Sequence, residues 1–460
     1  MSDLKQRARA LRTCILGLLA FSLWWSAEAK RPGPMVSRID ERGLVSWQPA
    51  PNTRSDPQGF LVDQVEAFEA SEKSLTTRLL LRSGGQPRPL SLREIQNEVL
   101  DPSTLLLEYS LGETRSFLWV VSPGSIHTYV LPPRSEIETA AIRVHELLAR
   151  GYARATKVQL EVELIRLSDM LLKPAAAHLD AETLAIVPDG ALHLIPFAAL
   201  PDPRSRPEER EPLVSGYQIV NLPSASTLPL LRDRAGRRAA PRQLAVLADP
   251  VFSPEDPRVS QPGPSTLQPF PRLPFSEKEA EAILSLVPRQ NRLAALGFAA
   301  NRRAVLDGLL DNYRFIHFAT HGLTSGPLKD SGLVLSSIDE NGKIQEPILR
   351  DSEVSQLNLA ADLVVLSACG TQSSEGMTAL ARSFLDAGAS RVLVSSWSVS
   401  DRATARFMTY FYRKLLVEKH SPAAALRKAQ ESMRAEPSWA SPYYWASFAI
   451  QGDWRWETVP

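Results

Sequence analysis

The chain has 460 residues, of which 44% are hydrophobic and 22% charged, and its formal net charge is +1. This composition is typical of a soluble globular protein with enough residues for two or three domains. Because Arg and Glu are interspersed without long runs of one sign, we expect neither a nucleic-acid-binding surface nor a charged interaction tail.

Residues 1–29 have the pattern of a secretory signal peptide. A basic segment precedes an apolar stretch over 13–25 that is too short for a comfortable membrane span, and Ala27-Glu28-Ala29 supplies a cleavage site of the A-x-A type. We therefore expect export to the periplasm or the extracellular space. The alternative is a membrane anchor formed by the same segment left uncleaved. No later segment has 18 consecutive apolar residues, so we expect no further contact with a membrane.

The chain has two cysteines, Cys14 and Cys369. Removal of residues 1–29 would leave Cys369 alone, and a single cysteine cannot form an intramolecular disulfide. A lone thiol in an exported protein is either an inert buried side chain or a reactive one. Composition alone favours the inert side chain.

The next 70 residues divide into two segments. Residues 30–57 are rich in Pro, Arg and Ser without periodicity, which predicts a flexible linker. Residues 58–98 carry apolar side chains at near-helical spacing, which predicts a helical segment.

A β-rich stretch follows, and then two amphipathic helices. Short β-rich runs at 104–110, 115–121 and 125–131 are separated by glycine-containing turns and predict a hairpin or meander. Apolar residues at helical spacing predict helices over 134–150 and 157–172.

From residue 183 onward, strands and helices alternate. The predicted strands are 183–187, 192–195, 217–221, 243–248, 314–319, 332–335, 362–367 and 391–396. The predicted helices are 275–286, 302–311, 377–387, 401–417 and 421–435. Near-continuous apolar strands that alternate with helices predict an α/β fold, with a mostly parallel sheet flanked by helices on both faces and an N-terminal hairpin and helical extension. The Pro-rich residues 249–274 are expected to form a long surface connection.

Two of these apolar strands end in a reactive side chain followed by glycine. Residues 315–322 end in His321-Gly322, and residues 363–370 end in Cys369-Gly370. Ligands of open parallel sheets bind beyond the carboxyl ends of the strands. If the two strands are neighbours, His321 and Cys369 lie on the same rim of the sheet.

Such a pair can perform nucleophilic catalysis. A free thiol has a pKa of about 8.5, so it needs a neighbouring imidazole to remove its proton or to stabilise the thiolate. Histidine titrates near neutrality and can later protonate a leaving amine. The backbone amides of Gly322 and Cys369 could donate to a developing oxyanion.

Other interpretations of these residues stay open. A histidine at a strand end is often a structural residue, and a cysteine after an apolar strand is often part of the core. His317 and His321 together raise the possibility of a metal site, but the spacing falls on a strand and no third ligand is evident. We therefore expect no metal and no cofactor. Motifs of serine hydrolases, P-loop proteins and zinc peptidases are absent from the sequence.

The two strand ends, Phe-Ile-His-Phe-Ala-Thr-His-Gly at 315–322 and Asp-Leu-Val-Val-Leu-Ser-Ala-Cys-Gly-Thr at 362–371, resemble the CHAT domain. This is a caspase-like module often found behind tetratricopeptide repeats. The resemblance extends over about residues 95–455. Further segments that carry it are 100–121, 185–200, 220–228, 244–252, 273–283, 331–336, 380–404 and 441–454.

The resemblance implies the fold of caspases, gingipains and separase, with a CHAT domain over 99–456. Its N-terminal half would be 99–240 and its catalytic half 241–456. In that family, His321 would be the general acid and base, Cys369 the nucleophile and Gly322 a donor to the oxyanion.

The segment after the last parallel strand resembles the part of the family that shapes the substrate pocket. Within it, Asp401 could bind a basic P1 side chain and Trp397 could form a pocket wall. The alternatives are that Asp401 caps the helix that begins near Arg402 and that Trp397 belongs to the core.

Two departures from the family pattern bear on activity. Residues 370–379 are several residues shorter than the usual loop after the cysteine, and the roughly 70 residues before the domain are too few for a repeat array. The leading hypothesis is a cysteine endopeptidase with a protein or peptide substrate and a possible regulatory protein partner. The alternative is a non-enzymatic or latent interaction module.

Overall fold

The structure is a computed structural model of the chain. It describes residues 35–39, 45–49, 57–83, 88–150, 154–206, 208–236, 240–260, 270–323, 331–370 and 374–456, and of Cys369 and Gly370 it describes the backbone. The expected signal peptide lies outside these residues. Among the residues described, no helix combines the length and the apolar character needed to cross a bilayer.

The chain forms two compact units, residues 1–70 and 71–460. In the first unit, strands β1 (Met35–Ile39) and β2 (Val45–Pro49) pair antiparallel. They lie within residues 30–57, for which a flexible linker was expected. Val45 and Trp47 alternate with polar residues, which is the period of a strand, but the surrounding Pro and Arg obscure this short pattern. Helix α2 (Pro57–Ser83) belongs to the first unit up to Ala70 and to the second beyond it.

The second unit contains one mixed sheet. Its strands are β3 (Thr104–Ser110), β4 (Ser116–Ser122), β5 (Ser125–Leu131), β6 (Thr183–Val187), β7 (Gln218–Asn221), β8 (Arg242–Ala248), β9 (Arg292–Leu296), β10 (Tyr313–Leu323), β11 (Gly332–Val334), β12 (Ile348–Arg350), β13 (Leu363–Gly370), β14 (Arg391–Ser395) and β15 (Phe448–Gly452). Over the described part of the chain these 13 strands follow the order β12-β11-β10-β13-β14-β15-β7-β6-β3-β4-β5, with β8 against β10 and β9 against β8.

Most neighbours in this sheet are parallel, as the alternation of strands and helices predicts. The parallel pairs are β10–β13, β10–β8, β13–β14, β8–β9, β15–β7, β3–β6 and β6–β7. The expected α/β architecture with a mostly parallel sheet flanked by helices is therefore confirmed.

Helices cover both faces of the sheet. The α-helices beyond α2 are α3 (Leu92–Glu94), α4 (Arg134–Ala149), α5 (Arg154–Leu171), α6 (Leu228–Gly236), α7 (Pro274–Leu284), α8 (Arg302–Leu306), α9 (Asp351–Val354), α10 (Ser374–Asp386), α11 (Asp401–Tyr412), α12 (Pro422–Ala435) and α13 (Pro442–Trp445). Short 3-10 and π turns are η1 (Ile95–Val99), η2 (Lys173–His178), η3 (Gly190–Leu194), η4 (Phe197–Ala199), η5 (Leu213–Ser215), η6 (Ala225–Thr227), η7 (Arg289–Asn291), η8 (Gly297–Ala299) and η9 (Arg413–Val417).

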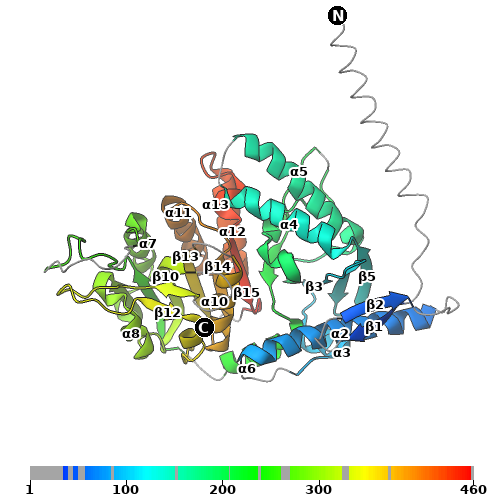
Figure 1. Ribbon diagram of the computed structural model, residues 1–460, viewed down its shortest axis with the longest axis horizontal. Coiled ribbons are helices and arrows are strands. Elements are labelled where there is room, and N and C mark those ends of the chain that lie inside the picture. Colours follow the sequence, from blue (N-terminus) through cyan, green and yellow to red (C-terminus); the bar gives the residue numbers. More distant parts are fainter. Residues whose placement is uncertain are drawn as a thin grey trace, which may run out of the picture. The chain divides into compact units, whose positions relative to one another are not determined.

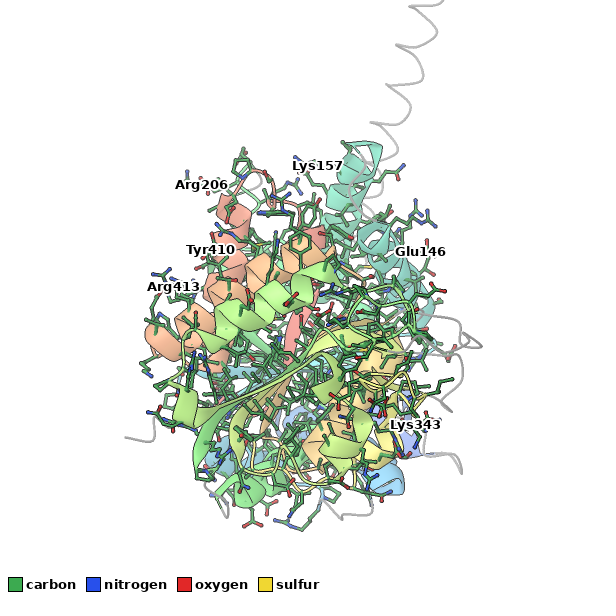
Figure 2. All side chains as sticks on the ribbon, turned by 90° about the vertical axis from the view of Figure 1, so that its left-hand side faces the viewer. Glu146, Lys157, Arg206, Lys343, Tyr410 and Arg413 are labelled. Carbon is green, nitrogen blue, oxygen red and sulfur yellow. The ribbon has the colours of Figure 1, made fainter. Side chains whose placement is uncertain are left out.

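Consecutive residues of β10 show the layers directly, because side chains of a strand alternate between the two faces. His317 contacts α7 and α11, whereas Phe318 packs against Phe384 of α10 with ring centroids 5.6 Å apart. Figure 1 shows β10, β13, β14 and β15 side by side, with α7 and α11 together on one side of them. Figure 2 shows exposed side chains such as Lys157, Lys343 and Arg413 at the periphery, outside the helices and loops.

Several elements differ from the sequence prediction, which did not include β12, β15 or α6. Residues 192–195 do not form a strand, because the short η3 turn begins at Gly190 with φ +55° and Pro196 follows closely. The helix expected over 302–311 is only α8, which ends at Leu306 shortly before Gly308 takes a φ of +88°. Strand β9 was not predicted, because its Ala-rich sequence has little β propensity.

Candidate active site

The two strand-end residues lie directly opposite each other. Strands β10 and β13 run parallel over eight residue pairs, from Phe315 opposite Leu363 to Gly322 opposite Gly370, and His321 is paired with Cys369. Adjacent strands are about 4.8 Å apart, so the backbones of His321 and Cys369 are nearest neighbours across the ladder. Sequence reasoning placed both residues at the carboxyl rim of the sheet, and the structure brings them together there.

The neighbour on the other edge of β10 changes at this point. Up to Ala319, that edge pairs in parallel with β8, and from His321 to Leu323 it pairs antiparallel with β11. Strand β8 ends at Ala248, so the chain leaves the sheet just below His321. Beside His321 at this rim lie Phe252, which follows β8, and Phe270 and Pro271, which precede α7.

The imidazole of His321 is held by that segment. Its Nε2 lies 2.7 Å from the carbonyl oxygen of Pro271, and its ring lies among Phe252 and Phe270, with centroids 5.2 and 5.6 Å away. A carbonyl only accepts, so Nε2 must carry the proton. In the neutral imidazole, Nδ1 is then the nitrogen that can accept a proton.

Three effects set the proton affinity of His321. Burial lowers its pKa below the ordinary value of 6.5, and this effect is the largest. The hydrogen bond to Pro271 and the charge of Asp401 both act in the opposite direction. Because the net shift is downward, the ring is predominantly neutral at neutral pH, which is the form that a general base needs.

Asp401 lies at the start of α11, near His321, but it does not cap that helix. Ser400 is the N-cap residue, and its Oγ accepts from the backbone N–H of Ala403 at 3.2 Å. The Asp401 carboxylate instead accepts from the backbone N–H of Phe275 in α7, at 2.7 Å. Burial raises the pKa of Asp401. The alternative of a simple helix cap is therefore wrong, and a role in substrate binding stays a prediction.

Trp397 and Gly322 have well-defined surroundings. The indole of Trp397 is 4% exposed, donates to the carbonyl of Tyr443 at 3.0 Å and meets His145 edge-on. Gly322 is buried in β10 between Gly370 and Leu333. The pocket-wall role of Trp397 and the oxyanion roles of Gly322 and Cys369 stay predictions.

His317 is part of a buried polar group rather than a metal site. Its Nε2 lies 2.8 Å from the Glu279 carboxylate and its Nδ1 lies 3.1 Å from the Tyr412 hydroxyl. Because a carboxylate only accepts, Nε2 carries a proton and donates to Glu279, and Nδ1 is paired with the Tyr412 hydroxyl. Within the residues that the structure describes, no three His, Cys, Asp or Glu side chains converge as metal ligands would.

Sequence reasoning missed a charged cluster at the same rim. Asp249 directly follows β8, and its buried carboxylate binds both Arg258 and Arg272. The signal was present, because Asp249 follows an apolar strand just as His321 and Cys369 end theirs. The Pro271 carbonyl was missed too, and a backbone carbonyl leaves no mark in the sequence.

Comparisons with known proteins agree with this architecture. The model of the family described as "CHAT domain" matches residues 162–453. Tetratricopeptide repeat protein 28 of Homo sapiens is 28% identical over 312 residues, and that of Mus musculus is 26% identical over 308. Each match covers 58% of this chain and 12% of the relative, so the chain spans about an eighth of those proteins.

Among solved structures, the Saccharomyces cerevisiae separase–securin complex resembles this fold. The match has a TM-score of 0.53 and covers 86% of this chain and 34% of that one. The sequences are 10% identical over it, so the likeness concerns the fold.

Proposed function

Since the chain belongs to the CHAT domain family and carries a caspase-like, peptidase-related domain, we propose that it is a cysteine endopeptidase that cleaves a protein substrate. The observation that carries this proposal is the register of β10 and β13, in which His321 is the neighbour of Cys369. The tautomer of His321 supports it, because Nδ1 is the nitrogen left to accept a proton.

In the proposed reaction, Nδ1 of His321 takes the proton of the Cys369 thiol, and the thiolate attacks the scissile carbonyl carbon. The backbone amides of Gly322 and Cys369 donate to the oxyanion. The intermediate collapses to a thioester as His321 returns the proton to the leaving amine. His321 then deprotonates a water that hydrolyses the thioester, which releases the new carboxyl group and restores the thiol.

The same proposal assigns Asp401 and Trp397 a role in substrate binding. The Asp401 carboxylate lies at the rim near His321 and is half-buried, where it could bind a basic P1 side chain. Trp397 would form the wall of the pocket. The separase structure was solved with securin, and by analogy we propose a regulatory protein partner for this chain. The proposal also includes export of the protein, directed by residues 1–29 as a signal peptide.

The second candidate function is a non-enzymatic or latent interaction module. The observation that favours it is the short connection after the nucleophile, because β13 ends at Gly370 and α10 begins at Ser374. A peptidase that needs a longer loop to complete its pocket would be inactive with this connection.

One experiment separates the two functions. The wild-type protein and the Cys369→Ala variant are profiled against an unbiased peptide library and treated with an acyloxymethyl-ketone probe. We expect cleavage and labelling by the wild type, neither by Cys369→Ala, and much slower labelling of His321→Ala. Equal cleavage by the wild type and Cys369→Ala would exclude the proposed nucleophile, and an unlabelled wild type would favour the interaction module.

A further inference from the structure

Asp249 is an unusual residue for a strand end. Its φ of +48° lies in the left-handed region, which Asp tolerates better than most residues but still adopts rarely. Its carboxylate is 3% exposed. A buried carboxylate in an uncommon backbone conformation is costly unless specific partners compensate it, and these partners are arginines.

Two guanidinium groups bind this carboxylate. Nη1 of Arg258 donates to Oδ2 of Asp249 at 2.6 Å. Arg272 donates through two nitrogens, from Nε to Oδ1 at 2.9 Å and from Nη2 to Oδ2 at 2.8 Å. A two-nitrogen fork fixes the orientation of the guanidinium as well as its distance. Asp249 therefore anchors Arg272 in one position.

Anchoring Arg272 also restricts where the Pro271 carbonyl can lie, because this carbonyl and the Arg272 backbone nitrogen belong to one planar peptide group. The segment is held a second time three residues after Arg272, where the Phe275 N–H donates to Asp401 at 2.7 Å. Directly before the first of these attachments, the Pro271 carbonyl accepts from Nε2 of His321 at 2.7 Å. Two carboxylates from separate elements thus hold the turn that contacts the imidazole.

We propose that Asp249 is a positioning residue for His321: through Arg272 it holds the Pro271 carbonyl against Nε2–H and thereby keeps Nδ1 free of a proton. The consequence for catalysis rests on the proposed peptidase function, whereas the tautomer is a property of the fold. Asp249 itself makes no contact with the imidazole in the described structure, so its effect passes through the peptide group of Pro271.

A neighbouring carboxylate in the same cluster provides a matched control. Asp256 binds Arg258 with two bonds, from Nε and from Nη2, both at 2.8 Å. It is also an acid on the connection after β8, and its side chain is 8% exposed. Replacing Asp256 disturbs the cluster but leaves the fork between Asp249 and Arg272 in place.

The pKa of His321 depends on the groups that face its imidazole ring. They are the Pro271 carbonyl, the Asp401 carboxylate and the rings of Phe252 and Phe270. Behind them lie the charges of the cluster and of Glu277, which binds Arg272 at 3.1 Å. A loosened Pro271 carbonyl removes one of the two interactions that favour the protonated ring, so the pKa of His321 should fall.

The experiment records the ring nitrogen resonances of His321 in the full chain, assigned by their loss in His321→Gln. In the wild type we expect the tautomer protonated at Nε2. Asp249→Asn should shift His321 toward a mixture of tautomers and lower its pKa, Arg272→Lys should do so partly, and Asp256→Asn should leave both unchanged. Circular dichroism and thermal denaturation establish that each variant folds.

Activity is measured separately, on a peptide that the wild type cleaves. We expect Asp249→Asn to lower kcat by ten- to a hundred-fold with little change in KM, as misplacement of a catalytic group does. A folded Asp249→Asn or Arg272→Lys variant whose His321 resonances match the wild type would overturn the proposal. If the wild type cleaves nothing, the peptidase function fails, and the resonances alone still decide the role of Asp249.

Discussion

His321 combines two requirements that oppose each other. A general base must be unprotonated before the reaction, which burial among Phe252 and Phe270 favours by lowering its pKa. The same ring must become a cation during the reaction, which the Pro271 carbonyl and the Asp401 carboxylate stabilise. Asp401 therefore acts on His321 electrostatically, whatever it does for a substrate.

Substitution of Asp401 by Asn should move the pH dependence of the site. In the wild type, the rate at which the probe labels the thiol should rise with pH as His321 loses its proton. The midpoint of this rise should lie below pH 6.5, because the pKa of His321 is lowered. Asp401→Asn keeps an oxygen that can accept from Phe275 but removes a charge that raises the pKa of His321, so the midpoint should move to lower pH. The measurement is the rate of probe labelling against pH.

Asp256→Asn is the comparison for this variant, because it also removes one negative charge from the same rim. A midpoint that moves equally in both variants would mean that the effect is general electrostatics of the rim. A midpoint that does not move in Asp401→Asn would contradict the interaction between Asp401 and His321.

At the scale of elements, the sequence was sufficient where an element has a strong pattern of its own. The long apolar runs of β10 and β13 predict buried parallel strands, and their ends predict the juxtaposition of His321 and Cys369. Strand β9 is Ala-rich and is held by its pairing with β8, which no local pattern reveals. Residues 192–195 are apolar enough for a strand but follow a glycine that turns the chain.

The missed parts of the site are tertiary in origin. Pro271 reaches His321 across 50 residues through a backbone carbonyl, and a backbone atom has no sequence signature. Asp249 could be recognised only as a polar residue after an apolar strand. Its two arginine partners lie 9 and 23 residues further on, within a Pro-rich stretch that shows no periodicity.

Two buried carboxylates, Glu72 and Glu108, interact in the second unit. Glu72 of α2 accepts from the backbone N–H groups of Ala225 and Ser226, at 2.8 and 3.1 Å, and from the hydroxyls of Ser224 and Ser226. Glu108 of β3 is fully buried nearby. Burial, and after it the charge of Glu72, holds the pKa of Glu108 well above its usual range.

Glu108→Gln should therefore stabilise the protein increasingly as the pH rises. A carboxyl whose pKa is raised by folding contributes stability that is fully present below its unfolded pKa and lost as the pH rises through its folded pKa. Gln keeps the shape of the side chain but cannot ionise, so this loss disappears. The melting temperature, measured over roughly pH 5 to 9, should show a gain in Glu108→Gln that grows with pH.

Glu98 provides the control, because it lies in the same unit but is exposed. Glu98→Gln should show the same melting temperature as the wild type at each pH. A constant difference between Glu108→Gln and the wild type across the pH range would mean that folding does not raise the pKa of Glu108, and it would contradict the prediction.

At the scale of the whole second unit, strand β15 joins the two halves of the sheet. Strand β15 lies between β14 of the catalytic half and β7 of the N-terminal half. The residues after it reinforce this connection, because the Trp454 indole donates to Asp101 at 2.8 Å and Arg455 donates to the carbonyls of Val99 and Leu100. The two halves expected from the sequence therefore share one continuous sheet.

A shared sheet predicts that the two halves unfold together. Asp453 follows β15 and receives two bonds from Arg232 of α6, at 3.1 and 2.9 Å, with 9% and 20% of the two side chains exposed. Asp453→Ala leaves the Arg232 guanidinium partly buried without its carboxylate, which should cost about 2–3 kcal/mol in the free energy of unfolding, less than a fully buried pair would.

Hydrogen exchange, measured separately for each strand, distinguishes a cooperative unit from two halves that unfold independently. Cooperative unfolding through β15 means that Asp453→Ala lowers the protection of β10 and β13 by the same free energy as that of β3 and β6. Arg303→Ala is the control, because the pair of Arg303 with Asp307 is exposed at 88% and 67% and contributes little. Loss of protection confined to β7 and β15 in Asp453→Ala would contradict the cooperative sheet, and the site at His321 would then rest on the catalytic half alone.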